Sequence, residues 1–299
     1  MDRRNFIRKS VVAAAATACY GLNGKMARSA AAMPGAKGKN RIGIQLFSIH
    51  ATLPDDHKGC LKKLSDTGYS YAEAYGFDGS VFLKKRLTEW SAMLKDVGMQ
   101  LSGTHCGTGL LPADVQAGEW DYWRKSIDEM NAAGGKRLIQ SFLPAGKTQD
   151  EVKRTAEQFN RIGELCKAGG IKFGYHNHHS EFKPVDGEIV FDLLLRNTDA
   201  GLVFFQIDLG HAVNGGGDIL AYMRNYPGRF LAWHASDFKK GQGYTEVGEG
   251  DVPYDALFDL AASYGLEDLT VEQETDGDVY ASCKRDFDFL IKYPWTKIE

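Results

Sequence analysis

From residue 41 onward, one unit recurs along the chain: a short apolar segment, a polar turn, an amphipathic segment and a glycine. Eight of the apolar segments are typical of strands, and they start at Ile42, Tyr71, Met99, Lys136, Ile171, Leu202, Arg229 and Leu269. Alternating strands and helices predict a parallel sheet with right-handed crossovers, and eight units in about 250 residues favour a closed barrel over an open sheet. The sequence therefore predicts an α/β fold, a single (β/α)8 TIM barrel.

The segment that starts at Glu151 illustrates the predicted helices. Val152, Phe159 and Ile162 fall on one stripe of a helix, and charged residues lie mostly on the other side, so this helix covers a sheet with one face only. The first strand is not followed by a GxGxxG pattern, which argues against a dinucleotide-binding fold. No linker interrupts the chain, and we expect residues 36–299 to form one domain.

The N-terminus carries a targeting pattern. Arg3 and Arg4 lie in the stretch DRRNFIRK, and a weakly apolar run follows from Val11 to Cys19. This arrangement is typical of a twin-arginine export peptide. We therefore expect residues 1–35 to be a signal peptide and linker, and the mature protein to be periplasmic or otherwise exported.

Several alternatives stay open at this end of the chain. Cleavage can follow the small residues from Ala30 to Ala32, a lipid can be attached at Cys19, or the two arginines can be a chance feature of a cytosolic protein. No later stretch approaches the ~18 continuous apolar residues that a membrane span needs. We therefore expect no membrane span in the domain.

The charge and cysteine content restrict the partners. The 36 basic and 39 acidic residues are spread along the chain and give a formal net charge of -3, without the basic stripe that nucleic acid requires. The expected partner is a small molecule, and a homo-oligomer stays open. The 5 cysteines include no CxxC pair, so we expect reduced thiols.

Histidines gather at the predicted strand ends. Six of the 8 histidines lie at or just after them: His105, His176, His178, His179, His211 and His234. Four carboxylates accompany them: Asp208, Asp237, Glu272 and Glu274. In a barrel the carboxyl ends of the strands converge on one face, which brings these residues together. Any one of these histidines alone can equally be a hydrogen-bonded core residue, but together they indicate a site.

Strand alternation points the same side chains inward. His176 and His178 share one side of their strand, and Asp208 shares a side with Gln206. A bare carboxylate inside the barrel is costly without a cation. Imidazole with carboxylate ligands suits manganese, cobalt, zinc or iron better than magnesium, so we expect one divalent metal ion.

These segments resemble the xylose isomerase-like barrels, a family that includes sugar isomerases and epimerases, inosose dehydratase and the endonuclease IV class. The resemblance spans nearly all of residues 41–292. Its most specific stretches are QIDLGHAVNGGGD from Gln206, YPGRFLAWHASDFK from Tyr226, VGEGDVPYDALF from Val247 and LTVEQE from Leu269. The resemblance implies that Asp208, His234 and Glu272 bind the metal.

The fourth ligand departs from the family pattern. Family isomerases and epimerases usually carry a glutamate at the end of strand five, whereas this chain reads GYHNHHSEF with His176 at that place. We expect His176 to take over as metal ligand, which leaves the usual pair of proton-transferring glutamates incomplete. The candidates for proton transfer are then Glu272, His178, His211 and Glu181.

The resemblance implies a divalent-metal-dependent sugar isomerase or epimerase that works through an enediolate. The YHNH pattern favours a non-phosphorylated sugar or keto-sugar. The alternative is a lyase, hydratase or dehydratase of 3-keto-glycosides or keto-cyclitols, because the DLGH, GEG and VEQE segments are similar to inosose dehydratase. Candidate substrate contacts are His105, Glu73, Gln140, Trp233 and Asp237.

The sequence supports two other functions less well. An endonuclease IV-like nuclease needs three metals and a positive cradle for DNA, but strand four offers Gln140 and Ser141 where a histidine would be needed. A barrel that binds sugar without converting it also stays open. Aromatic residues near the strand ends can stack on a sugar or belong to the core: Tyr71, Tyr75, Phe47, Trp233 and Phe238.

Overall fold

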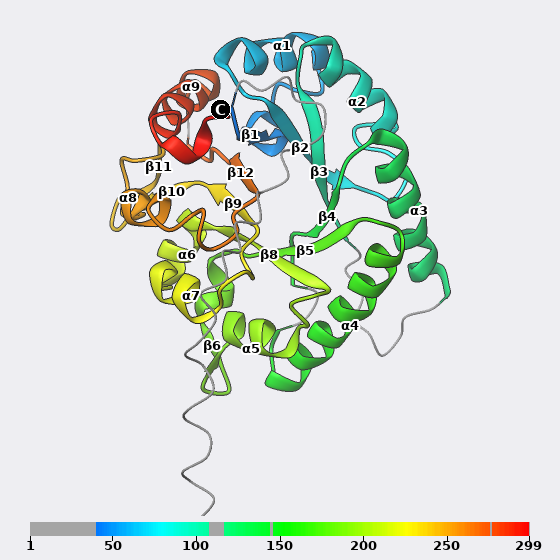
Figure 1. Ribbon diagram of the computed structural model, residues 1–299, viewed down its shortest axis with the longest axis vertical. Helices are drawn as coiled ribbons and strands as arrows, with labels where there is room; N and C mark the ends of the chain where they lie inside the picture. Colours follow the sequence, from blue (N-terminus) through cyan, green and yellow to red (C-terminus); the bar gives the residue numbers. More distant parts are fainter. Residues whose placement is uncertain (1–39, 108–116, 144–145, 276, 299) are drawn as a thin grey trace, which may run out of the picture. The chain divides into compact units, whose positions relative to one another are not determined.

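The computed structural model describes residues 40–107, 117–143, 146–275 and 277–298, so the predicted export signal lies outside the described residues. Eight parallel strands close into a barrel in the order β1-β12-β9-β8-β5-β4-β3-β2 (Figure 1). They are β1 Ile42–Gln45, β2 Tyr71–Phe77, β3 Gln100–Cys106, β4 Arg137–Gln140, β5 Lys172–His176, β8 Val203–Asp208, β9 Ala232–Ala235 and β12 Asp268–Val271. The prediction of a single eight-stranded TIM barrel is confirmed.

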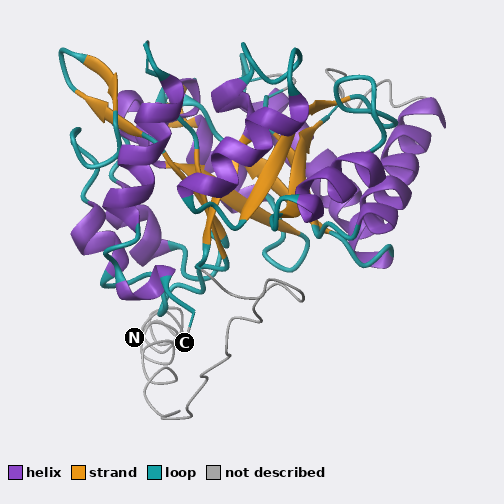
Figure 2. Ribbon diagram, turned by 90° about the horizontal axis from the view of Figure 1, so that it is seen from above, coloured by secondary structure: helices purple, strands orange, loops and turns teal. Residues whose placement is uncertain are grey.

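Helices surround the strands in an outer layer, as Figure 2 shows. They are α1 His57–Thr67, α2 Leu87–Asp96, α3 Ala117–Ala133, α4 Gln149–Ala168, α5 Val190–Asn197, α6 Leu209–Gly215, α7 Ile219–Asn225, α8 Tyr254–Phe258 and α9 Val279–Leu290. In α4 the expected stripe is buried, and the ring of Phe159 packs on Phe173 and Tyr175 of β5. Among the described helices, none combines the length and the apolar character that crossing a membrane would require.

Short elements line the carboxyl ends of the strands. They are the 3-10 helices η1 Leu46–Ile49 and η3 His179–Phe182, the hairpin β6 Pro184–Val185 with β7 Glu188–Ile189, and the hairpin β10 Asp237–Lys239 with β11 Gly243–Thr245; a further 3-10 helix, η4 Pro294–Thr296, follows α9. The first predicted strand is shorter than expected, because η1 begins at Leu46. In η1 the backbone N–H of Phe47 donates to the side chain of Gln45, which ends the strand there.

The amino end of the barrel is closed by a floor of polar and aromatic side chains. Arg137 Nη1 donates to Asp268 Oδ2 over 2.8 Å, and both residues are buried. The ring of Tyr71 lies over Gly43, where an added Cβ would meet the ring at 1.9 Å. Tyr71 therefore belongs to the floor, at the end of the barrel opposite the predicted site.

Apolar side chains fill the next layer of the interior. Ile139, Phe204 and Ala232 form a small buried cluster of their own, separate from the core between strands and helices. A Cβ at Gly174 would meet the Phe204 ring at 2.4 Å, so the glycine makes room for it. These layers separate the floor from the carboxyl end of the barrel, where the predicted site lies.

Candidate metal centre and active site

Strand alternation brings a polar cluster into the carboxyl end of the barrel. The contributing residues are Gln45 of β1, Glu73 of β2, His105 of β3, His176 of β5, Gln206 and Asp208 of β8, His234 of β9 and Glu272, which follows β12. All of them are buried. Residues more than 200 positions apart in the chain thereby share one site.

The four predicted metal ligands lie together. His176, Asp208, His234 and Glu272 each offer a ligand atom, and these atoms all lie within 4.8 Å of one another. His234 Nδ1 is 2.7 Å from Glu272 Oε2, and His176 Nε2 is 4.0 Å from the same oxygen. Within the described part of the chain, His176 Nδ1 and Asp208 Oδ2 are buried without a hydrogen-bond partner. A divalent cation fits this donor set, because buried polar atoms without partners are costly.

The DLGH spacing has a local structural reason. Asp208 is the N-cap of α6, and its Oδ1 accepts a hydrogen bond from the backbone N–H of His211, three residues later, over 2.7 Å. Ser236 Oγ donates to the same oxygen over 2.6 Å. Asp208 Oδ2 is thereby left available, and the short helix that follows aims the His211 side chain at the same end of the barrel.

Burial and neighbouring charges set the protonation of the ligands. Burial, reinforced by His234 and His105, lowers the pKa of His176 well below its usual value, so this imidazole is neutral and has a lone pair to offer. Burial lowers the pKa of His234, but the carboxylates of Glu73 and Glu272 outweigh this and raise the pKa to about 10. Burial raises the pKa of Asp208 to about 6.

A second group of polar side chains lies beside the ligands. The rings of His178 and His211 are 4.8 Å apart, and the His178 ring is 5.1 Å from that of His176. His211 Nε2 is 3.3 Å from Glu274 Oε1, and the Tyr244 hydroxyl hydrogen-bonds to His211 Nδ1. Although burial lowers the pKa of His211, Asp208 and Glu274 raise it to about 9, whereas burial and His211 lower the pKa of His178. A protonated and a neutral imidazole therefore stand side by side.

Four predicted site residues are placed elsewhere. Trp233 alternates with His234, so it points outward, and its ring contacts Phe258 of α8. Asp237 accepts hydrogen bonds from the backbone N–H groups of Phe238, Gly248, Gly250 and Val252, which occupies both of its oxygens. The structure thus places Trp233 against a helix and gives Asp237 partners in its own loop, and it does not bring either residue to the buried ligand set.

Glu181 and Gln140 also have internal partners. Glu181 accepts hydrogen bonds from the Tyr175 hydroxyl, the His178 backbone N–H and Ser180 Oγ, so this buried carboxylate holds η3 in place. It is not free to transfer a proton to substrate. Gln140 Nε2 donates to the backbone oxygen of Phe142 over 3.1 Å and stays at the rim of β4, outside the ligand set.

Two candidate substrate residues lie deeper than expected. Glu73 has no exposed surface and touches Gln45, Gln206, His105 and His234, so these four side chains enclose it next to the candidate ligand His234. His105 is bound into the same network. Tyr244 was not predicted, since its place depends on the β10–β11 hairpin folding over α6, and no motif in the sequence marks it.

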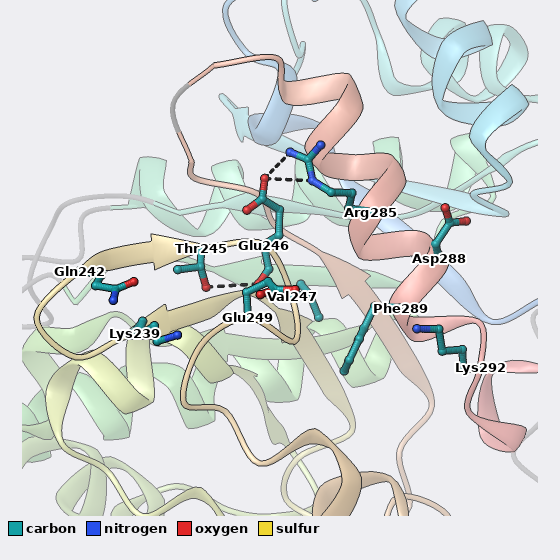
Figure 3. Close-up of a pocket in the computed structure, with 10 residues that line it drawn as sticks. All are labelled: Lys239, Gln242, Thr245, Glu246, Val247, Glu249, Arg285, Asp288, Phe289 and Lys292. Carbon is teal, nitrogen blue, oxygen red and sulfur yellow. Dashed lines mark hydrogen bonds and ion pairs between the residues drawn. The ribbon is translucent and has the colours of Figure 1, made fainter.

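A separate pocket lies between the β10–β11 hairpin and α9 (Figure 3). It has a volume of about 580 Å³ and is lined by Lys239, Gln242, Thr245, Glu246, Val247, Glu249, Arg285, Asp288, Phe289 and Lys292. Arg285 pairs with Glu246 inside it. Charges of both signs line this pocket, and it contains none of the predicted ligands, so the barrel cluster remains the candidate site.

Comparisons with known proteins identify the family of this barrel. Residues 61–293 match the family model for the xylose isomerase-like TIM barrel. An inosose dehydratase from Clostridium perfringens is 30% identical over 147 residues, which cover 43% of this chain and 49% of that protein. The chain thus spans about half the length of the curated relatives it matches.

Solved structures extend the comparison to most of the chain. A sugar phosphate isomerase/epimerase from Parabacteroides distasonis superposes with a TM-score of 0.76 at 28% identity, covering 88% of this chain and 97% of that one. A 3-keto-D-glucoside 4-epimerase from E. coli shares the fold, with a TM-score of 0.62 at 14% identity over 85% of this chain and 99% of that one. The chain belongs to the xylose isomerase-like TIM barrel family.

Proposed function

We propose that this protein is a divalent-metal-dependent enzyme that moves a proton on the carbon next to the carbonyl of a sugar or keto-sugar, giving an isomer or epimer. The observation that carries the proposal is the buried set of four ligands at the carboxyl end of the barrel, with two atoms lacking partners within the described residues. The resemblance to a sugar phosphate isomerase/epimerase over most of the chain supports it.

The four candidate ligands support metal-assisted chemistry at this site. His176, Asp208, His234 and Glu272 would hold a divalent cation, which would supply a Lewis acid to polarise a carbonyl and offset the negative charge that develops on its oxygen. Two imidazoles and two carboxylates suit manganese, cobalt or zinc better than magnesium.

Proton transfer falls to groups on two sides of this set. Glu272 follows β12, whereas His178 follows β5, and β9 and β8 separate these strands in the barrel. Burial raises the pKa of Glu272, but His234 outweighs this and lowers it, so the side chain is a carboxylate that accepts a proton. With Glu272 on one side of the ligand set and His178 on the other, one group could remove a proton from one face of the substrate and the other could return a proton to the opposite face.

Elimination is the second candidate reaction, and the pairing of His178 with His211 favours it. The neutral His178 would take the proton from the carbon next to the carbonyl, while the protonated His211 would give a proton to the departing oxygen as the carbon–oxygen bond breaks. The products are an unsaturated ketone and water or an alcohol. The inosose dehydratase relatives support this reaction.

Three features favour a non-phosphorylated substrate. Among the described residues of the cluster, none is a lysine or arginine that would pair with phosphate. Phe47 is 42% exposed just beyond β1, where its ring stacks on His50 and meets Tyr75 edge-on, leaving a face for a sugar ring. The twin-arginine pattern at Arg3 and Arg4 supports an exported enzyme that meets free sugars or glycosides.

Deuterium exchange distinguishes the candidate reactions. The metal-loaded protein is incubated in deuterated water with free sugars and with 3-keto-glycosides, and the products are followed by mass and proton spectroscopy. Deuterium at the carbon next to the carbonyl, with the skeleton unchanged, is expected for an isomerase or epimerase; loss of water or an aglycone would favour elimination. Absence of exchange with every substrate, despite bound metal, would overturn both. Protein treated with a chelator is the control.

A further inference from the structure

Glu73 forms the hydrogen-bonding centre beneath the metal ligands. Its Oε1 accepts from Gln45 Nε2 over 2.8 Å and lies 2.9 Å from both His105 Nε2 and His234 Nε2, and its Oε2 accepts from Gln206 Nε2 over 2.9 Å. Four polar side chains surround this carboxylate, and it has no exposed surface through which a substrate could reach it.

His234 links this carboxylate to the ligand set. Its Nε2 faces Glu73, and its Nδ1 lies 2.7 Å from Glu272 Oε2. Glu272 is one of the ligands, so Nδ1 is the nitrogen on the metal side and Nε2 is the nitrogen on the far side. Each nitrogen therefore has a carboxylate oxygen within hydrogen-bond distance. A cation bound at Nδ1 would take the place of the hydrogen there, while the acceptor at Nε2 would hold the remaining hydrogen on the far side.

The surroundings hold Glu73 in one orientation. Gln45 and Gln206 come from β1 and β8 and each donate to a different oxygen, so rotation of the carboxylate breaks a buried hydrogen bond on either side. His105 Nε2 is also 2.9 Å from Gln206 Oε1, which ties β3 into the same arrangement. Three strands thereby fix the acceptor that faces His234.

We propose that Glu73 is a positioning residue: it fixes the tautomer and ring orientation of His234 so that Nδ1, and not Nε2, binds the divalent cation. Removing a carboxylate that accepts a hydrogen bond from a metal-binding histidine typically lowers metal affinity by about 10–100-fold. This inference rests on the metal site of the proposed function and adds which nitrogen binds and what holds it there. It assigns Glu73 no direct contact with substrate.

Metal titration tests the assignment without any turnover. Mn²⁺ is titrated by calorimetry into the full-length metal-free protein and into Glu73→Gln and Glu73→Leu. Glutamine keeps one oxygen for His234, so we expect affinity to fall about 10-fold in Glu73→Gln and about 100-fold in Glu73→Leu, with the wild-type stoichiometry of one ion retained. Bound Co²⁺ should change its visible spectrum in both variants.

Asp268→Asn is the matched control, because Asp268 is also a buried carboxylate inside the barrel but lies in its floor against Arg137. It should lower stability and leave Mn²⁺ affinity at the wild-type value. If the Glu73 variants do not fold, Gln206→Met removes one donor to Glu73 and should weaken Mn²⁺ binding by a smaller factor.

Two results would overturn the inference. Wild-type affinity in folded Glu73→Leu would show that His234 needs no acceptor. Two ions in the wild type and one in the variant would make Glu73 a ligand at a second position near His105, His176 and His234, whose ligand atoms also lie within 4.8 Å of one another. Absence of metal binding to the wild type would instead overturn the proposed function together with this inference.

Discussion

Asp208 divides its two oxygens between structure and chemistry. Oδ1 is occupied by the His211 backbone N–H and by Ser236 Oγ, whereas Oδ2 is buried and has no partner in the described part of the chain. The N-cap contact stabilises α6 through Oδ1 and leaves Oδ2 available. One residue therefore begins a helix and presents a free carboxylate oxygen of fixed direction, a candidate metal ligand.

Asp208→Asn separates these two tasks. Asparagine keeps an oxygen for His211 and Ser236 but places an amide donor where the free oxygen was, so the fold should persist while Mn²⁺ affinity falls by roughly 100-fold or more. Calorimetry measures the affinity and circular dichroism the fold. Asp218→Asn, at the N-cap of α7, is the control and should bind like wild type. Wild-type affinity in Asp208→Asn would remove Asp208 from the ligand set.

At the scale of elements, the β10–β11 hairpin completes the site. Tyr244 pairs with Phe238 across the hairpin, and its hydroxyl hydrogen-bonds to His211 Nδ1 and accepts from Asn214 Nδ2 over 3.3 Å. The loop after the hairpin is held by Asp237, which accepts from three of its backbone N–H groups. The hairpin thus holds the His211 ring against Glu274.

Tyr244→Phe should slow turnover without weakening metal binding. Loss of the hydroxyl frees the His211 ring, and because a positioned acid or base contributes about 100-fold or more, losing its support should lower kcat about 10-fold with little change in KM. Steady-state kinetics and Mn²⁺ titration measure the two effects. Tyr222→Phe, on α7, should leave both unchanged. An unaltered kcat would exclude a positioning role for Tyr244.

Strand alternation and barrel topology made the fold and the clustering of the four candidate ligands predictable. They place His176, Asp208, His234 and Glu272 inside one end of the barrel, as the sequence predicts. The same alternation argues against Trp233, which is the immediate neighbour of His234 and has to point outward.

The remaining site residues depend on partners that the sequence does not reveal. Asp237 and Glu181 are satisfied by hydrogen bonds from loops whose conformation follows from tertiary packing. Glu73 has its four partners on β1, β3, β8 and β9, so its depth emerges only when the barrel closes. Tyr244 reaches His211 only through the register of a hairpin.

Helix α9 carries a buried carboxyl group that makes stability depend on pH. Burial raises the pKa of Asp286 to about 7, although hydrogen bonds from the Val247 backbone N–H and Gln273 lower it. An unfolded aspartate has a pKa near 3.9. Between about pH 4 and pH 7, Asp286 is protonated in the folded protein but ionised in the unfolded chain. Its contribution to the free energy of unfolding is therefore complete below about pH 4 and is lost as the pH rises through about 7.

Asp286→Asn tests that pH dependence. Between pH 5 and pH 8 the wild type should lose about 2 kcal/mol more free energy of unfolding than the variant, because asparagine does not titrate. Urea unfolding at both pH values measures the difference. Parallel changes in the two proteins would show that Asp286 keeps an ordinary pKa in the folded state.

At the scale of the whole molecule, the two ends of the barrel have different tasks. The floor pairs the charge of Arg137 with that of Asp268 and fills the space over Gly43 with Tyr71, although Arg137 Nε has no hydrogen-bond partner among the described residues. The opposite end leaves His176 Nδ1 and Asp208 Oδ2 without partners within the described residues. A cation bound at this end would link the ends of β5, β8, β9 and β12, so metal binding should stabilise the closed barrel as a whole.

Thermal unfolding with and without metal measures that coupling. At 100 times its dissociation constant, Mn²⁺ that binds only the folded protein adds about 2.7 kcal/mol, which for a domain of this size raises Tm by about 5 to 10 °C. A chelator should reverse the shift, and Asp208→Asn should show almost none. Asp268→Asn should melt lower than wild type yet gain the same increment, because its defect lies in the floor. An equal Tm with and without Mn²⁺ in the wild type would mean that the barrel end closes without a cation.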